Sequence, residues 1–163
     1  MRPGIQSIDA RLMARLLEEA RRSPRRRVNH NFHGSPAEDP NRFLNVMVAG
    51  TYVAPHRHLT VPKPEVFVVL EGRLDLFIFD DEGRVEGRIA IGEGAPDGRV
   101  GIDLAAGIWH TIAVPGPYVV VFEVKPGGYD PATDKQFAPW APREGEPGAE
   151  EYLARLLAGA ETA

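Results

Sequence analysis

The stretch Gly50-Thr51-Tyr52-Val53-Ala54-Pro55-His56-Arg57-His58 decides the fold, together with the Glu65 and Gly72 that follow it. His56 and His58 are two residues apart, so on a strand both imidazoles leave the same face. Six residues separate His58 from Glu65, and six more separate Glu65 from Gly72. This pattern predicts a metal site built on β-strands. Two imidazoles and a carboxylate are suitable ligands, and the flanking glycines allow the chain to turn.

A second segment, Gly107-Ile108-Trp109-His110, supplies a third histidine of the five in the chain. The chain has no cysteine, so a metal must be bound by histidine, aspartate or glutamate. We therefore expect one divalent metal ion per chain, held by His56, His58, Glu65 and His110. Four protein ligands would fill a tetrahedral zinc site. An ion that accepts five or six ligands keeps room for substrate, which favours Fe, Mn, Ni or Co in function, although Zn also binds such sites tightly.

The region around these residues has the period of two that is typical of β-strands. Leu74, Leu76 and Ile78 alternate with Asp75, Phe77 and Phe79, for example. Turn sequences such as Glu71-Gly72 and Pro115-Gly116 separate the runs. The expected strands cover residues 43–48, 51–55, 66–70, 73–79, 87–91, 100–104, 109–114 and 118–124. About eight short antiparallel strands predict an all-β fold, the double-stranded β-helix or jelly roll.

Helices are expected at both ends of this region. Residues 8–21 have an amphipathic pattern, with Ser7 as the N-cap and Pro24 ending the helix. A short helix over about 149–157 follows a segment rich in proline and glycine. We expect a single domain over 1–163, with a helical extension at 1–24, a barrel core at about 42–126 and a C-terminal segment at 127–163.

Composition excludes some classes of partner. The net charge of −4 argues against a nucleic-acid-binding protein, since such proteins need a concentrated basic surface. No apolar run is long enough to cross a membrane, and residues 1–7 lack the apolar region of a signal peptide. We expect a cytoplasmic protein that binds neither nucleic acid nor membrane. Exposed sheet edges make a homodimer the expected assembly.

The two histidine segments resemble the two-part signature of the cupins. In the first part, Gly50, His56-Arg57-His58, Glu65 and Gly72 stand where that signature has its glycines, histidines and glutamate. In the second, Gly107 precedes His110. The gap before Glu65 is longer than usual, Ala105 replaces a proline, and Val114 stands where an asparagine is frequent. The resemblance implies a cupin fold and the same four metal ligands.

A narrower resemblance, over about residues 22–157, is to the WbuC-like cupin-fold metalloproteins of the RmlC-like cupin superfamily. The segments that carry it include Arg26-Arg27-Val28-Asn29-His30-Asn31-Phe32-His33, Lys63-Pro64-Glu65, Phe122-Glu123-Val124-Lys125-Pro126-Gly127 and Phe137-Ala138-Pro139-Trp140-Ala141-Pro142. The Lys-Pro-Glu step accounts for the longer gap before Glu65. The family is described mainly as metal-binding, and its genetic association implies surface-polysaccharide sugar chemistry.

Several polar residues are further candidates for the site. Tyr52 has the side-chain parity of His56, so we expect it, with His33, to serve as a catalytic group; core packing of Tyr52 and a turn role of His33 are the alternatives. The expected substrate-binding residues are Asn31, Arg26, Arg42 and Lys63; for Lys63 a salt bridge to a surface acid is favoured. Glu123, in an otherwise apolar strand, is either a partner of a ligand histidine or a strand-edge charge.

Together these observations favour a metalloenzyme, of isomerase or oxygenase type, that acts on a small polar metabolite. The expected ligand is a small molecule, a sugar or a carboxylate, and the expected setting is surface-polysaccharide biosynthesis. The alternative is a non-catalytic module that binds or senses a metal or a small ligand, because no side chain beyond the ligands is an unmistakable general base.

Overall fold

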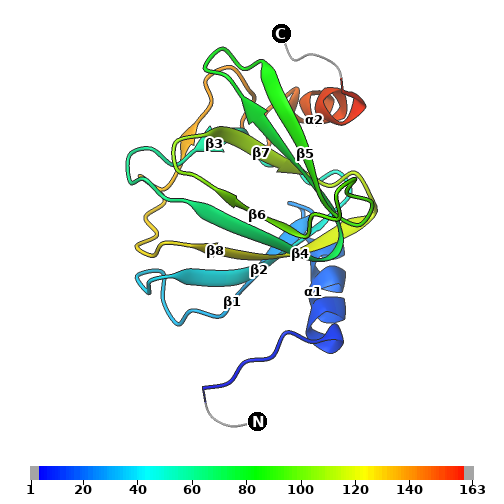
Figure 1. Cartoon of the computed structure of the whole chain (residues 1–163), viewed down its shortest axis with the longest axis vertical. Coiled ribbons are helices and arrows are strands. Elements are labelled where there is room, and N and C mark those ends of the chain that lie inside the picture. The colour runs from blue at the N-terminus through cyan, green and yellow to red at the C-terminus, as the bar shows by residue number, and fades with distance from the viewer. Residues whose placement is uncertain (1–3, 160–163) are drawn as a thin grey trace.

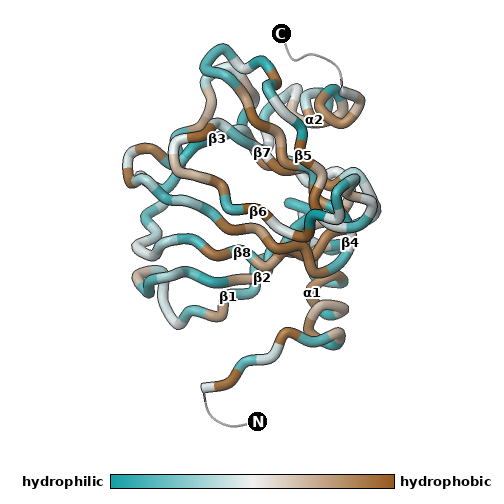
Figure 2. The backbone as a smooth tube through the Cα atoms, viewed as in Figure 1, coloured by the Kyte–Doolittle hydropathy of each residue, from teal (hydrophilic) through white to brown (hydrophobic). Residues whose placement is uncertain are grey.

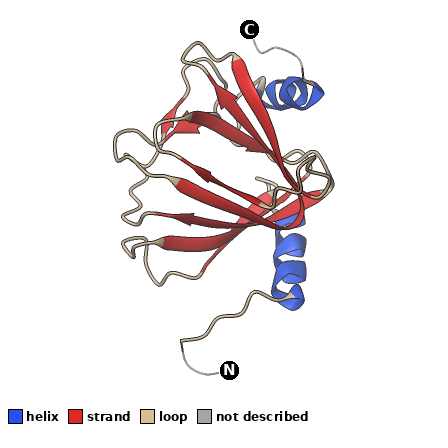
Figure 3. Ribbon diagram, viewed as in Figure 1, coloured by secondary structure: helices blue, strands red, loops and turns tan. Residues whose placement is uncertain are grey.

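Nine strands and two helices make up the computed structural model, which describes residues 4–159 (Figure 3). The elements are α1 (Ala10–Arg22), β1 (Arg27–Asn31), β2 (Asn41–Val48), β3 (His56–Arg57), β4 (Glu65–Phe79), β5 (Val85–Gly92), β6 (Gly101–Leu104), β7 (Trp109–Ala113), β8 (Tyr118–Lys125), β9 (Gln136–Phe137) and α2 (Ala149–Ala158).

The strands form one curled antiparallel sheet with the order β1-β2-β8-β4-β7-β3-β9. The first half of β4 pairs with β8 and β6, and its second half pairs with β7 and β5. Strand β4 therefore passes from one layer of the fold to the other, and the layers converge on one side of the molecule (Figure 1). This arrangement confirms the predicted jelly-roll, cupin-like fold with a helix near each end.

A β-bulge in β4 replaces the turn expected at Glu71-Gly72. The pairing of β4 with β8 shifts between Val69 and Glu71, so the strand bends without ending. Gly72 has φ +74°, and a Cβ there would lie 2.3 Å from the carbonyl oxygen of Tyr118. Only glycine fits a position with both features. The expectation of two strands, 66–70 and 73–79, was wrong because the glycine serves a bulge.

The segment 51–55 is not a strand, although its sequence pattern predicts one. Two of its backbone carbonyls accept hydrogen bonds from side chains, and that of Pro55 accepts from the amide of Ala138, just after β9. Arg27 donates to the carbonyl of Tyr52 at 2.8 Å, and Thr111 donates to that of Val53. Regular pairing in this region is restricted to β3.

Three apolar clusters make up the core of the fold. The central one lies between the layers and contains Met47, Phe67, Val69, Leu74, Leu76, Ile91, Leu104, Ile112, Val114, Val119 and Val121. Figure 2 shows the hydrophobic stretches of β4 and β8 on the side where the layers converge. The opposite ends of β1 and β2 are more hydrophilic, and there the space between the layers is a polar cavity, described below.

The two helices cover outer faces of the sheet. Helix α1 buries Leu16 and Ala20 against Leu44 and Val46 of β2, as its amphipathic pattern predicts. Its N-cap is Asp9, whose carboxylate accepts from the amide of Leu12 at 2.8 Å, and not the predicted Ser7. Helix α2 packs with the C-terminal segment on the outer side of β4 and β7. Neither helix is long and apolar enough to cross a bilayer.

Candidate metal centre

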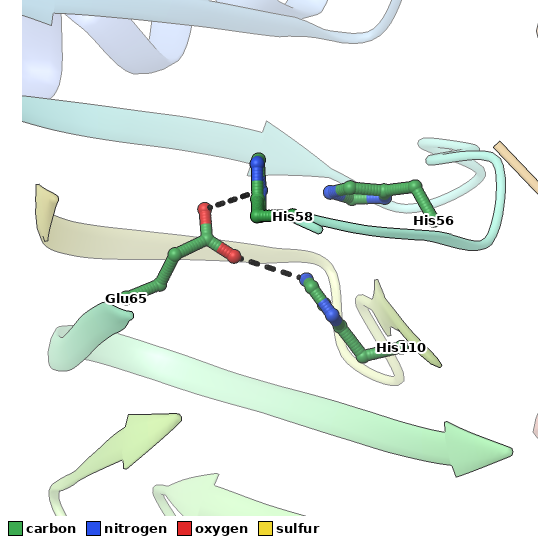
Figure 4. Close-up of side chains that lie close together, drawn as sticks. All are labelled: His56, His58, Glu65 and His110. Carbon is green, nitrogen blue, oxygen red and sulfur yellow. Dashed lines mark ion pairs between the residues drawn. The ribbon is translucent and has the colours of Figure 1, made fainter. Parts of the chain in front are cut away.

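Three neighbouring parts of the sheet bring together the four side chains that the sequence predicts as ligands (Figure 4). His56 begins β3 and is paired directly with His110 of β7. His58 follows β3, and Glu65 is the first residue of β4. All four side chains are buried, with exposed fractions of 2–4%. Strands fix the positions of His56, Glu65 and His110 more firmly than loops would.

The four residues offer one ligand atom each, and these atoms all lie within 4.8 Å of one another. Nε2 of His110 lies 3.0 Å from Oε2 of Glu65, and Nε2 of His58 lies 3.3 Å from Oε1 of the same carboxylate (Figure 4). The Nε2 of His58 and the Oε2 of Glu65 are fully buried and make no hydrogen bond of normal geometry with any of residues 4–159.

Backbone carbonyls fix the tautomer of all three imidazoles. Nδ1 of His56 lies 3.0 Å from the carbonyl oxygen of Ala54, and Nδ1 of His110 lies 2.9 Å from that of Ile108. Nδ1 of His58 contacts the carbonyl oxygen of Asp134. A carbonyl only accepts, so each neutral ring carries its proton on Nδ1 and presents a lone pair at Nε2.

Three such lone pairs and a carboxylate form a buried group of acceptors without a donor among them, which is the donor set a divalent cation requires. Burial, and then the charge of Lys135, hold the pKa of His56 well below its usual value. Burial alone would raise the pKa of Glu65, but hydrogen bonds from His110 and His58, in the state in which these rings also carry a proton on Nε2, outweigh it and hold that pKa well below its usual range. A cation would take the place of those protons. The residues present therefore fit a divalent metal.

A buried chain of charges runs behind this cluster. Nζ of Lys63 lies 2.8 Å from Oδ1 of Asp134, and Nζ of Lys125 lies 3.3 Å from Oδ2 of the same carboxylate. Lys125 also lies 3.9 Å from Oε1 of Glu65. Because the carbonyl of Asp134 faces Nδ1 of His58, this chain links two of the predicted ligands to the segment that precedes β9.

A cavity of about 450 Å³ opens beside the cluster, and His56, Glu65 and His110 form part of its wall. Most of its other lining residues are polar, and they come from β1 and the residues that flank it, from β2 and β8, and from the segment before β9. These are Arg25, Arg27, Asn29, Asn31, His33, Asn41, Asn45, Glu123, Lys125, Asp134 and Lys135. The volume is within the range of small-molecule sites, roughly 300–1,000 Å³.

Glu123 is a buried carboxylate in this cavity, 6% exposed. Its neighbour is the Nδ2 of Asn45, which donates to Oε2 at 3.5 Å. Burial, followed by repulsion from Glu65, raises the pKa of Glu123 to about 7. The side chain is therefore a cavity group with a shifted proton affinity, separate from the four-residue cluster.

The other predicted site residues are distributed between the cavity and the outer surface. Asn31 and His33 line the cavity, and Nδ1 of His33 lies 3.0 Å from both the amide nitrogen and the carbonyl oxygen of Arg42. Arg42 itself forms an ion pair with Glu38 and does not line the cavity. Lys63 forms a salt bridge, but its partner is the buried Asp134 and not a surface acid.

Tyr52 and Arg26 lie away from the cluster. Tyr52 packs against Tyr152, and its hydroxyl donates to the carbonyl of Pro142 at 2.6 Å. Arg26 has φ +56°, and its guanidinium donates to the carbonyl of Ala49 at 3.3 Å. Neither side chain lines the cavity of the metal cluster. Side-chain parity with His56 predicted that Tyr52 faces the site, but segment 51–55 is not a regular strand, so the parity rule does not hold there.

Sequence reasoning missed several lining residues, most clearly Asn45, Lys125, Asp134 and Lys135. The first two could have been found, because Asn45 in β2 and Lys125 in β8 alternate with apolar neighbours that face outward. Asp134 and Lys135 lie in an irregular segment, where no periodicity indicates which side chains point inward. Their place in the cavity depends on the tertiary fold.

Comparison with known proteins gives a family for the chain. The family model described as "Domain of unknown function (DUF6016)" matches residues 8–91. A search of curated proteins gives no match.

Solved structures give the fold. The capsular polysaccharide assembling protein CapF from Staphylococcus aureus is 22% identical over 67% of this chain, with a TM-score of 0.51. The match covers only 28% of that CapF chain. Cellulomonas parahominis L-ribose isomerase, solved with L-psicose, is 15% identical over 78% of this chain and 72% of its own, with a TM-score of 0.55. The protein TT1209 from Thermus thermophilus is 17% identical over 76% of this chain and 98% of its own, with a TM-score of 0.53. At these identities the similarity shows a common cupin-like fold.

Proposed function

We propose that this chain, which belongs to the family described as Domain of unknown function (DUF6016), is a metal-dependent enzyme that acts on a small polar, sugar-related metabolite. That description names no activity, so the proposal is argued from the side chains of the protein itself. The observation that carries the proposal is the fixed tautomer of three imidazoles, whose free Nε2 atoms converge with Glu65 in a buried cluster. His56, His58, Glu65 and His110 would hold the metal. A bound divalent ion supplies Lewis acidity toward a substrate oxygen.

The chain's own groups favour catalysis over a purely structural metal site. Three of the four predicted ligands line an open cavity, so a bound molecule can reach the centre. Glu123, in the same cavity, has a pKa raised to about 7, the range in which a carboxyl group can both take up and release a proton near neutral pH. A sealed, dry site would favour the non-catalytic sensing module instead. Isomerase and oxygenase types both remain within this proposal, and the identity of the metal separates them.

Metal content is the first test. Protein purified without added metal or chelator should contain about one Fe, Mn, Ni, Co or Zn ion per chain, measured by inductively coupled plasma mass spectrometry. His58→Ala should lose it, since one ligand of four disappears. His30→Ala, in β1 outside the cluster, is the matched control and should retain the ion. Absence of metal from the parent protein after reconstitution with each of these ions would contradict the proposal.

Activity is the second test. The metal-replete protein is incubated with sugars, sugar nucleotides and keto acids, and products are followed by mass spectrometry. We expect turnover of at least one class, lost in His58→Ala. Metal binding without turnover in this screen would favour the binding or sensing module. We further propose that the protein is a member of the WbuC-like group and takes part in surface-polysaccharide biosynthesis. We also propose a cytoplasmic location and a homodimeric assembly. Light scattering tests the assembly.

A further inference from the structure

The floor of the cavity is a polar face that crosses four neighbouring strands. In antiparallel sheets, directly paired residues lie on the same face. Asn29 of β1 is paired with Asn45 of β2, and Phe43 of β2 is paired with Glu123 of β8. Glu123 is in turn paired with Phe67 of β4, two residues from Glu65. The polar residues of this face are therefore continuous with the wall that carries the predicted metal ligands.

One part of this floor requires a hydrogen-bond donor from the ligand. Oδ1 of Asn45 is buried and accepts no hydrogen bond from any of residues 4–159, although the side chain lines the cavity. Beside it, the carboxylate of Glu123 receives only the long 3.5 Å contact from Nδ2 of the same asparagine. Buried acceptors without donors are costly, and two ligand hydroxyl groups, one donating to each acceptor, would satisfy them.

Another part offers a cation. Lys135 lines the cavity, and no hydrogen bond or close ion pair engages its ammonium group among the described residues; the carboxylates of Glu65, Glu123 and Asp134 act on it only from a longer distance. The other cations of the cavity wall are already engaged: Lys125 pairs with Asp134, while Arg25 and Arg27 share the carboxylate of Glu144. Lys135 is therefore the cation of the cavity wall that remains available to a negatively charged ligand.

The form of this cationic site favours a carboxylate over a phosphate. A phosphate carries more charge and is often bound by a guanidinium fork or the N-terminus of a helix, whereas one lysine supplies a single point charge. Both guanidinium groups at the rim are held by Glu144, and neither α1 nor α2 contributes a residue to the cavity. A single ammonium group matches the charge of one carboxylate.

We propose that this cavity binds a small polyhydroxylated carboxylic acid, with its carboxylate at Lys135 and its hydroxyl groups at Asn45 and Glu123. This assignment names the substrate class of the proposed metal site and rests on it, because the ligand would lie between these groups and the four-residue cluster.

Isothermal titration calorimetry with three probes tests the assignment. D-gluconate carries both features, sorbitol keeps the hydroxyl groups without the carboxylate, and hexanoate keeps the carboxylate without the hydroxyl groups. We expect gluconate to bind at least about tenfold more tightly than either of the others, because sorbitol lacks the charged hydrogen bond to Lys135 and hexanoate lacks the hydroxyl hydrogen bonds to Asn45 and Glu123. The metal content of each sample is measured before and after titration, since gluconate itself chelates metals.

Two variants separate the two recognition features. Lys135→Gln should reduce the affinity for gluconate to that for sorbitol. Asn45→Leu, which replaces a buried unpaired amide by an apolar group of similar size, should weaken binding of gluconate and sorbitol but not of hexanoate. Arg22→Gln on exposed α1 is the control and should bind as the parent does.

The outcomes distinguish this inference from the proposed function. Equal affinity for gluconate and sorbitol, or no binding of any probe by protein that carries its metal, would overturn the substrate class while leaving the metal site standing. Protein that contains no metal after reconstitution would instead overturn the proposed function. Unchanged gluconate affinity in Lys135→Gln would show that the anion is bound elsewhere.

Discussion

At the scale of single residues, the tautomer of each imidazole determines what the cluster can bind. Each imidazole donates its Nδ1 proton to a backbone carbonyl, so none of the Nε2 atoms can donate to Glu65 while the ring is neutral. The 3.0 Å approach of His110 to Glu65 then places two acceptors side by side. A cation between them removes the repulsion, and for this reason we regard the cluster as a metal site and not as a buried polar network.

Glu123 leads to a prediction about pH. Its pKa is about 7 in the folded protein because burial, and then Glu65, disfavour the charged form. The folded state thus binds this proton more tightly than the unfolded chain, whose glutamates titrate near about 4.3. The contribution of this group to the free energy of unfolding is fully present below about pH 4 and is lost as the pH rises through about 7. In chelator-treated protein, Glu123→Gln should therefore raise Tm at about pH 8 and change it little at about pH 4.5.

The size of this effect follows from linkage. Even one unit of pKa difference corresponds to about 1.4 kcal/mol, or roughly 3–5 °C in Tm for a chain of this size. Differential scanning calorimetry at both pH values measures it. Glu86→Gln, on an exposed position of β5, is the control and should show no such pH dependence. An equal gain in Tm at both pH values would mean that ionisation of Glu123 at the higher pH does not lower the stability of the folded state.

At the scale of elements, the segment before β9 acts on the cluster through its backbone. The carbonyl of Asp134 orients His58, while its carboxylate is fixed by Lys63 and Lys125, all three side chains being buried. Burial alone would raise the pKa of Asp134, but Lys125 and Lys63 outweigh it and lower the pKa. The carboxylate is therefore charged near neutral pH and can hold the segment in place.

Asp134→Asn should accordingly weaken metal binding by about 10–100-fold, the usual effect of losing a group that orients a ligand. Competition with a chromogenic chelator measures the affinity, and circular dichroism checks that the fold is kept. Asp130→Asn is the matched control, because Asp130 lies in the same segment and its carboxylate accepts only from Ala132 and Thr133 among the described residues. An affinity within twofold of the parent would show that the position of His58 does not depend on the ion pair.

The same elements show how much of the fold can be predicted from the sequence. Helix α1 and strand β8 agree with their expected ranges within two residues, because periodic apolar residues mark them. Strand β1 was missed, since Arg27, Asn29 and Asn31 face a polar cavity and remove the apolar alternation that identifies a strand. At the site, spacing and the resemblance to the cupin signature singled out the four side chains that the structure clusters. Asp134 and Lys135 reach the cavity from a segment without regular structure, so only the fold reveals them.

At the scale of the whole molecule, the cluster connects parts of the chain that lie far apart in sequence. Its residues come from the ends of β3, β4 and β7, and a further link through Asp134 reaches the C-terminal segment. The apolar core fills the opposite side, where the layers converge (Figure 1). The open side therefore has little hydrophobic packing of its own, and a bound ion would be its main cross-link.

Removal of the metal should thus destabilise the entire fold and not only the site. An ion at about 100 times its dissociation constant stabilises the folded state by about 2.7 kcal/mol, or roughly 5–11 °C in Tm for a chain of this size. Calorimetry of the parent before and after chelation, and after the ion is added back, measures the shift. Glu65→Gln keeps the size of the side chain but loses the ligand charge, so its Tm should not respond to metal. His30→Ala should respond as the parent does. If the parent's Tm were unchanged by chelation that demonstrably removes the ion, the apolar core alone would hold both layers, and the cluster would have no structural role.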